Sequence, residues 1–251
     1  MPNNGLPGWE TEAIRLSVFP VSETAAVEAL HWEQAVGVPP ETVNRQSQQP
    51  QMPRIIEEGP WNNCRLQADS QRGQIHWRAF SGTPNPDGPG SIGSLSGVAR
   101  PFQAAMSQWF AAHCPAINRF AFGANLMIPA DSLQEVCAYL DGMLPTVSVA
   151  DAGARDFVYR INRRRQSRHH QGLGINRLAT WSAVQGMGFE IVIVGGVPSA
   201  RVSEGRNFCR LELDINTIPI PTDVIPREVL PNVFAELIDA AIEISIEGDI
   251  P

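Results

Sequence analysis

Residues 209–217 read CRLELDINT, and apolar and polar residues alternate along this stretch without a break. A period of two predicts a β-strand with one face toward a core and the other toward water. The stretch over 117–128 repeats the pattern. Antiparallel sheets commonly have one covered and one solvated face, so both stretches predict a sheet of that kind. The positions expected to face the core are Cys209, Leu211, Leu213 and Ile215 in one strand and Phe120, Phe122, Ala124, Leu126 and Ile128 in the other.

Outward from these strands, other periodic stretches are bounded by proline, glycine and capping residues. A helix should begin at Pro101, because proline favours the first helical position. Another should begin at Asp131, which forms a capping box with Gln134. The other expected elements are strands over 10–19, 157–161, 174–184 and 189–194, a hairpin over 65–80, a turn at Gly195–Gly196, a helix over 22–36 capped by Ser22 and ended by Gly37, and a helix over 231–246 with Glu236, Asp239 and Glu243 on its polar face.

Two long stretches, 38–62 and 81–100, show no clear period and are rich in proline with glutamine or glycine. Irregular segments of this length are uncommon in a compact domain unless they are functional or disordered. We expect them to be ordered by the body of the protein, by a twin subunit or by a larger assembly.

The order of elements suggests an internal duplication. A strand, a proline, a capping residue and a helix follow one another at 18–29 and again at 127–138, with Pro20 matching Pro129 and Ser22 matching Asp131. A chance likeness of two strand–helix units would give the same pattern. The expected fold is α+β, with a mainly antiparallel sheet and helices on one face. The expected halves are 1–115 and 116–251, either as one compact domain or as a duplicated β-α-β(n)-α pair.

Composition excludes several kinds of chemistry. All 19 basic residues are arginine, so a P-loop lysine, a Schiff-base lysine and a kinase lysine are excluded. There is no long apolar run and no signal-like start, and the four cysteines form no CxxC motif. We expect a cytoplasmic bacterial protein with reduced cysteines, no cofactor and no membrane partner.

A run of arginine over 155–171, RDFVYRINRRRQSRHHQ, contrasts with the net charge of −7 of the whole chain. Its strand part places Tyr159 and Ile161 inward and Arg160 and Asn162 outward, and the period ends at Arg163. The run could be a strand tip whose arginines are solvated, or a tip whose arginines pair with acidic residues of the same chain. It could also contact phosphates of a nucleic acid or an acidic surface of a protein, including another copy. The candidate binding residues are Arg160, Arg163, Arg164, Arg165, Arg168, His169 and His170.

Two weaker candidate sites concern catalysis and metal binding. His169 or His170 could act as a general acid or base in metal-independent RNA cleavage, although neighbouring strand residues point to opposite faces. Glu212 and Asp214 share a strand face and could bind a divalent cation, but solvated strand charges explain them better. We therefore expect no metal site. The favoured function is a non-catalytic binding or assembly component that uses the arginine-rich tip, and the alternative is an endoribonuclease that uses the two histidines.

Two short motifs resemble a sporadically distributed family of bacterial proteins of about this length. Residues 172–177, GLGINR, are similar to the strand GLRYIN of that family, and residues 211–216, LELDIN, followed by the helix over 233–246, are also similar. The chain has Gly174 where the family has arginine, and it lacks the aromatic residue that follows. The resemblance implies an α+β fold and no established activity. A sporadic distribution is typical of mobile or phage-defence genes. The link to defence is thus an analogy with the family and is not based on residues of this chain.

Overall fold

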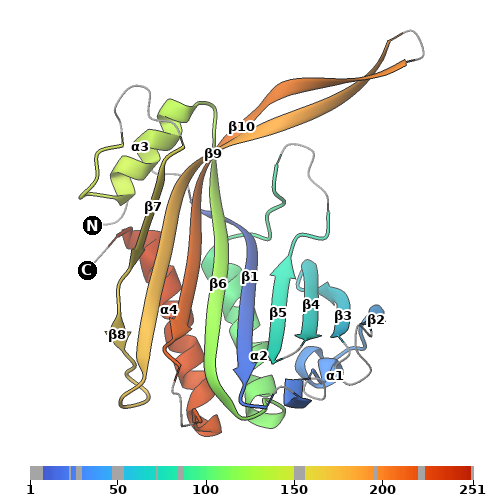
Figure 1. Cartoon of the computed structure of the whole chain (residues 1–251), viewed down its shortest axis with the longest axis vertical. Coiled ribbons are helices and arrows are strands. Elements are labelled where there is room, and N and C mark those ends of the chain that lie inside the picture. Colours follow the sequence, from blue (N-terminus) through green and yellow to red (C-terminus); the bar gives the residue numbers. More distant parts are fainter. Residues whose placement is uncertain are drawn as a thin grey trace.

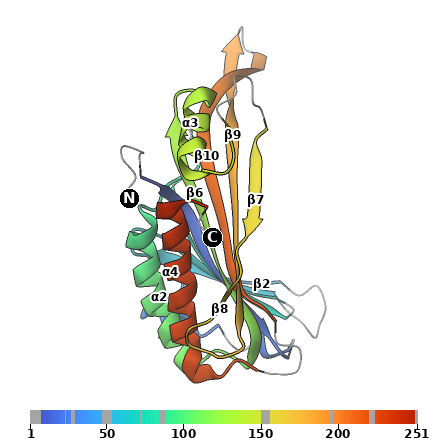
Figure 2. The same cartoon turned by 90° about the vertical axis from the view of Figure 1, so that its left-hand side faces the viewer.

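The structure is a computed structural model. It describes residues 8–22, 24–26, 30–46, 54–71, 73–83, 88–149, 156–194, 197–219 and 224–249, and within 186–194 and 197–204 it describes the backbone alone. One large antiparallel sheet carries two long helices on one face (Figures 1 and 2). The α+β class predicted from the alternating strands is therefore confirmed. Arg155 and the expected turn at Gly195–Gly196 lie outside the described residues.

The strands of the described chain form one sheet in the order β2-β3-β4-β5-β1-β6-β10-β9-β7, and β8 also pairs with β9. All the pairs are antiparallel. The bounds are β1 Glu10–Pro20, β2 Thr42–Gln46, β3 Arg54–Trp61, β4 Cys64–Gln71, β5 Gln74–Phe80, β6 Ile117–Ala130, β7 Val158–Asn162, β8 Arg165–Gln166, β9 Gly174–Val194 and β10 Val197–Thr217.

Helices α2 (Leu95–Ala112) and α4 (Leu230–Glu247) lie side by side on the covered face of the sheet (Figure 2). Helix α3 (Leu133–Met143) lies farther along, against β9 and β10. The shorter helical segments are η1 Thr24–Ala26, α1 Trp32–Val36 and η2 Arg227–Val229.

The order of elements is similar in the two parts of the chain. Strand β1 is followed by short helices, four strands and α2, and β6 is followed by α3, four strands and α4. The first strands of the two series, β1 and β6, are neighbours in the middle of the sheet. This topology agrees with two β-α-β(n)-α halves that share one sheet. The duplication itself, and the boundary between 115 and 116, stay predictions.

The alternating pattern of the central strands correctly predicts which residues are buried. The positions listed for 117–128 and 209–217 are all buried, as are Ile14, Leu16 and Val18 in β1. Phe234 on α4 joins the sheet to both helices, since its ring lies within 6.5 Å of the ring centroids of Phe102, Phe110, Phe120 and Phe122. The apolar stripe of α4 and the inner face of β6 therefore form one aromatic core.

The predicted helix over 22–36 is wrong as one continuous element. The chain forms η1 and α1 instead, and His31 between them has a φ of 47°. An α-helix cannot continue through a left-handed residue. The side chain of Ser22 contacts the hydroxyl of Thr24 at 3.0 Å. Gly37 ends α1 with a φ of 86°, as predicted.

The stretch over 38–62 is not irregular, because it contains β2 and β3. Every residue of β2 is exposed, so the strand has no buried face and shows no apolar period. Its regular structure comes from backbone pairing with β3, which in turn pairs with the predicted hairpin β4–β5.

Two predicted helix starts are corrected. Helix α2 begins at Leu95, six residues before Pro101, because Ser94 caps it and the buried Leu95 and Ala99 fix its first turns on the core. The capping box of α3 is shifted by one residue. Its N-cap is Ser132, whose hydroxyl accepts the backbone N–H of Glu135 at 3.2 Å, while the Glu135 carboxylate accepts the N–H of Asp131.

The strands predicted over 174–184 and 189–194 are one continuous strand, β9, which pairs with β10 from Ile175 to Val194 with one register shift, between Glu204 and Asn207. Strand β6 pairs with β10 no farther than Asn207, and β7 pairs with β9 no farther than Ser182. Beyond Gln185 and Asn207, the two strands pair only with each other among the described residues. Figure 1 shows this part leaving the body as a two-stranded ribbon, which we call the β9–β10 arm (residues 186–194 and 197–206).

Replacing Phe234 with alanine should destabilise the body strongly. The change removes a fully buried ring of α4 that packs against α2 and β6. We therefore expect the free energy of unfolding to fall by about 3–5 kcal/mol. Chemical denaturation measures the loss. The half-exposed Val38 provides the control, since Val38→Ala should change the free energy by less than about 0.5 kcal/mol. Equal effects of the two changes would contradict the proposed core.

Candidate functional site

The predicted arginine-rich site folds into the edge of the sheet beside α4. It consists of β7, β8 and the turn that leads into β9, and we call residues 158–173 the arginine tip. Backbone bonds close the turn, from Ser167 N–H to the Leu173 carbonyl at 2.8 Å and from Leu173 N–H to the His170 carbonyl at 3.2 Å. The carboxylates that contact this tip come from α4 and from Asp249 just after it. The tip is thus joined to the last helix of the chain.

Arg163 forms a two-pronged ion pair with Asp249. The Nε and Nη2 atoms donate to the two carboxylate oxygens at 3.1 and 3.0 Å, and the Tyr159 hydroxyl donates to the same group at 2.8 Å. The side chain of Asp249 is only 1% exposed. Burial alone would raise the pKa of Asp249, but the bonds from Arg163 and Tyr159 hold it below its ordinary value. A buried carboxylate of this kind is stable because its oxygens are paired.

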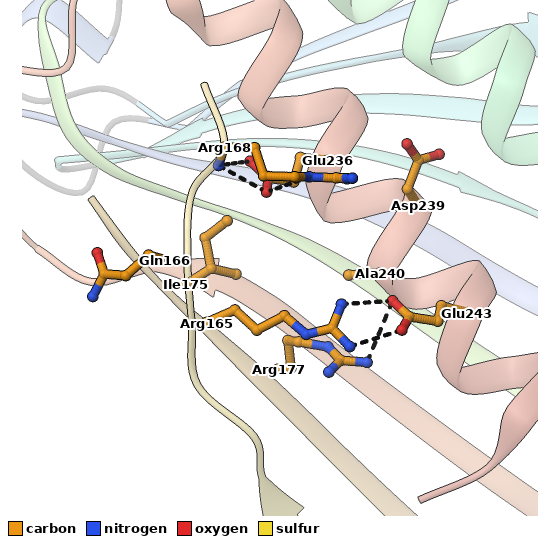
Figure 3. A pocket seen from close by; sticks show the side chains of 9 residues that line it. All are labelled: Arg165, Gln166, Arg168, Ile175, Arg177, Glu236, Asp239, Ala240 and Glu243. Atoms are coloured by element: carbon orange, nitrogen blue, oxygen red, sulfur yellow. Dashed lines mark hydrogen bonds and ion pairs between the residues drawn. The ribbon is translucent and has the colours of Figure 1, made fainter. Parts of the chain in front are cut away.

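Arg165 and Arg177 share one carboxylate on α4. Arg165 donates to both oxygens of Glu243 at 2.7 and 2.9 Å, and Arg177 Nη2 lies 3.6 Å from the same side chain (Figure 3). The hydrogen bond from Arg165, followed by the charge of Arg177, lowers the pKa of Glu243. The bond to Glu243 in turn raises the pKa of Arg165.

Glu236 holds the turn itself. Its carboxylate accepts the Ser167 hydroxyl at 2.8 Å and both the backbone N–H and the Nε of Arg168 (Figure 3). We expected Glu236 on the solvated face of its helix, and this expectation is wrong, because the side chain is only 8% exposed. The tip covers that part of α4 and supplies the donors that a buried carboxylate needs.

Three of the five predicted binding arginines are therefore paired with carboxylates of their own chain. Their density serves to fix the edge strands on α4, which was one of the three interpretations of the run. Arg160 and Arg164 are exposed, and no carboxylate among the described residues pairs with either. Within the described ranges, the arginines of the tip that have no carboxylate partner are thus these two.

The two histidines lie in the turn and do not form an acid–base pair with each other. The backbone N–H of His169 donates to the Ser167 hydroxyl at 3.1 Å, and His170 Nδ1 contacts the carbonyl of Gln171 at 2.9 Å. His169 is exposed and His170 is partly buried. No geometry at these residues favours the endoribonuclease.

Glu212 and Asp214 lie on the solvated face of β10, and each has a partner in its own chain. Glu212 lies 3.1 Å from Arg210 Nε, and Asp214 accepts the side-chain amide of Asn216 at 3.1 Å. Asn216 belongs to the polar set of the alternating pattern of 209–217, but it is buried and also bonded to Asn176. Within the described ranges, no group of three or more His, Cys, Asp or Glu residues could hold a metal ion.

Arg177 is a site residue that the sequence analysis missed. It is 1% exposed, and three of its side-chain nitrogens are buried without a hydrogen-bond partner. The sequence could have revealed its burial, because residues two positions apart on a strand lie on the same face. Arg177 therefore shares a face of β9 with Ile175, Ala179 and Trp181, which are all buried. An arginine at a position on the apolar face of an alternating strand predicts a buried charge.

No protein-family model, curated protein or solved structure matches this chain. The resemblance to a bacterial family therefore stays an expectation from short motifs. In the part of the chain that the structure describes, no helix is both long and apolar enough to cross a membrane.

Loss of the Glu243 carboxylate should make stability less dependent on acid pH. The pKa of Glu243 is lowered in the folded protein, so its stabilising effect is present above the ordinary value of 4.5 and is lost as the pH falls below it. We expect Glu243→Gln to lower the free energy of unfolding by about 1–3 kcal/mol at pH 7, because two arginines lose a charged partner.

Denaturation of wild type and Glu243→Gln between pH 3 and pH 7 checks this prediction. The difference between the two proteins should shrink toward pH 3, where the wild-type carboxylate is also neutral. Arg164→Gln is the matched control and should leave the stability unchanged at every pH. A difference that is the same at pH 3 and pH 7 would contradict an electrostatic role for Glu243.

Proposed function

We propose that this protein is a non-catalytic assembly component whose β9–β10 arm binds a second copy of the chain. The observation that carries the proposal is the arm itself, a two-stranded ribbon that leaves the sheet and whose register places three successive apolar pairs on one face. The proposal keeps the predicted class of function, but it moves the main contact from the arginine tip to the arm.

The arm has no third strand beside it within the described chain, so the outer hydrogen-bonding groups of both its strands are open. An isolated two-stranded ribbon is only marginally stable in water. Open strand edges also favour pairing with another chain. A ribbon of this length is therefore better explained if a partner covers it.

The register of the arm separates its residues into two faces. Directly opposed residues of an antiparallel pair lie on the same face, and successive pairs alternate between faces. One face has Glu190 opposite Arg201, with the Gly188–Ser203 and Val192–Ser199 pairs on either side. The other face holds only apolar residues over three successive positions, namely the pairs Phe189–Val202, Ile191–Ala200 and Ile193–Pro198.

A second copy of the chain fits this ribbon because the apolar face is complementary to itself. Two ribbons related by a twofold axis can stack with these faces together, as two sheets do, while the Glu190–Arg201 face stays in water. The exposed Arg160 and Arg164 remain able to contact acidic residues of the same partner, since the chain as a whole carries a charge of −7.

The size of the contact sets its expected strength. A standard stable interface uses about 20–30 residues on each side, which is more than the apolar face of one arm provides. We therefore expect a weak dimer whose population depends on concentration in the micromolar range, rather than an obligate one. Association would still place the three apolar pairs of one arm against those of the other.

Deleting the arm should abolish association without unfolding the body. The deletion replaces residues 186–206 with Asn-Gly, which suits a tight turn between the paired Gln185 and Asn207. By light scattering over a concentration series, the wild-type mass should rise from 27.4 kDa toward twice that value, and the deletion variant should stay at the mass of its monomer. The melting temperature of the body should change little, because among the described strands those of the arm pair only with each other.

Two double variants provide the matched comparison. Phe189→Ser with Ile191→Ser changes the apolar face and should weaken the dimer at least tenfold. Glu190→Ser with Arg201→Ser changes the opposite face and should leave association within about twofold of wild type. A wild-type protein that is monomeric throughout the series, or a deletion variant that dimerises like wild type, would overturn the proposal.

A further inference from the structure

A small pocket lies between α4 and the first residues of β9. Its volume is about 130 Å³, and its walls include three arginines and three carboxylates (Figure 3). This volume is equivalent to about four water molecules, so the pocket can hold a small ionic group but not a nucleotide.

Each carboxylate of the pocket already has an arginine partner of its own. Glu236 is paired with Arg168, and Glu243 is paired with Arg165. The third carboxylate, Asp239, is paired with Arg100 of α2 at 2.7 Å. Arg177 has no carboxylate of its own and shares Glu243 with Arg165, at 3.6 Å from its Nη2.

Arg177 lacks the acceptors that a buried guanidinium needs. Its Nε, Nη1 and Nη2 atoms are buried without hydrogen bonds, and the nearest carboxylate oxygen, on Glu243, is 3.6 Å away. Burial lowers the pKa of Arg177, and the charge of Arg165 lowers it further. An arginine nevertheless stays charged in proteins, so burying it without acceptors is costly.

We propose that this pocket binds a small monovalent carboxylate, whose oxygens supply the acceptors that Arg177 lacks. Figure 3 shows the guanidinium groups of Arg165 and Arg177 next to each other at the pocket wall, on the side of Glu243. Arg165 is 45% exposed and forms the outer part of this wall, so a ligand can approach from solvent. Planar guanidinium groups match carboxylate geometry well. The site is separate from the arm and does not depend on the proposed assembly.

The surrounding charges favour a carboxylate over a phosphate. Three arginines and three carboxylates line the pocket, so its formal charges sum to zero, and the carboxylates would repel a dianion more strongly than a monoanion. The pocket is also too small for a large apolar substituent. Acetate is therefore the simplest probe of the proposed site.

Thermal unfolding of the full chain in sodium acetate, sodium chloride and sodium phosphate at equal ionic strength tests the proposal. Acetate at ten times its dissociation constant should raise the melting temperature by about 3–5 °C above the value in chloride. The rise should saturate with acetate concentration, and phosphate should produce less than half of it.

Arg177→Leu is the decisive variant, because leucine suits the buried position and removes the guanidinium group that lacks hydrogen bonds. This variant should fold at least as stably as wild type in chloride and should show no additional effect of acetate. Arg164→Gln is the control, and it should keep the full acetate effect. An equal rise in chloride and acetate, a larger rise in phosphate, or an acetate effect that persists in Arg177→Leu would overturn the proposal.

Discussion

The continuous pairing of β9 with β10 is the constraint on which the rest of the structure depends. Near the body, this pair joins β6 on one side to β7 and β8 on the other, so it carries the edge of the sheet that bears the arginine tip. Farther out, beyond a register shift between Glu204 and Asn207, the pairing continues where no other described strand follows. One hairpin thus belongs to the folded core at one end and forms a projecting arm at the other. Its two ends have different surroundings, because among the described strands only the inner end has further strands beside it.

Helix α4 connects the core to the arginine tip. One side of the helix buries Phe234 and the other apolar residues against the sheet. Another side presents Glu236 and Glu243 to the edge strands, and Asp249 follows the helix end. A short edge strand such as β8 gains little from backbone pairing alone. Ion pairs with a helix that is already fixed by its apolar contacts therefore hold the tip in place.

The sequence was most informative where burial imposes a strict period. The strands around Leu16, Phe122 and Leu213 could be predicted because one face of each is fully buried and the other is not. Exposed edge strands such as β2 could not be predicted, since backbone pairing with a neighbour requires no particular side chain. The break at His31 was also hidden, because a left-handed histidine leaves no compositional signal.

Partners that are far apart in sequence explain the other errors. Arg163, Arg165 and Arg168 could be identified as a cluster, but their carboxylates lie about 70–90 positions later, and periodicity does not reveal such pairings. The continuity of β9 was missed because Gly186 and Gly188 resemble a turn. Arg177, in contrast, could have been recognised from its phase in the strand.

Hydrogen exchange of the arm amides gives the sharpest test of whether a second copy of the chain covers the arm. The exchange of residues 187–194 and 197–204 should be fast at nanomolar protein and at least tenfold slower at concentrations where the dimer forms. Amides of β1 and β6 should exchange at the same rate in both conditions, since they lie in the body. Exchange of the arm that does not depend on concentration would contradict the claim.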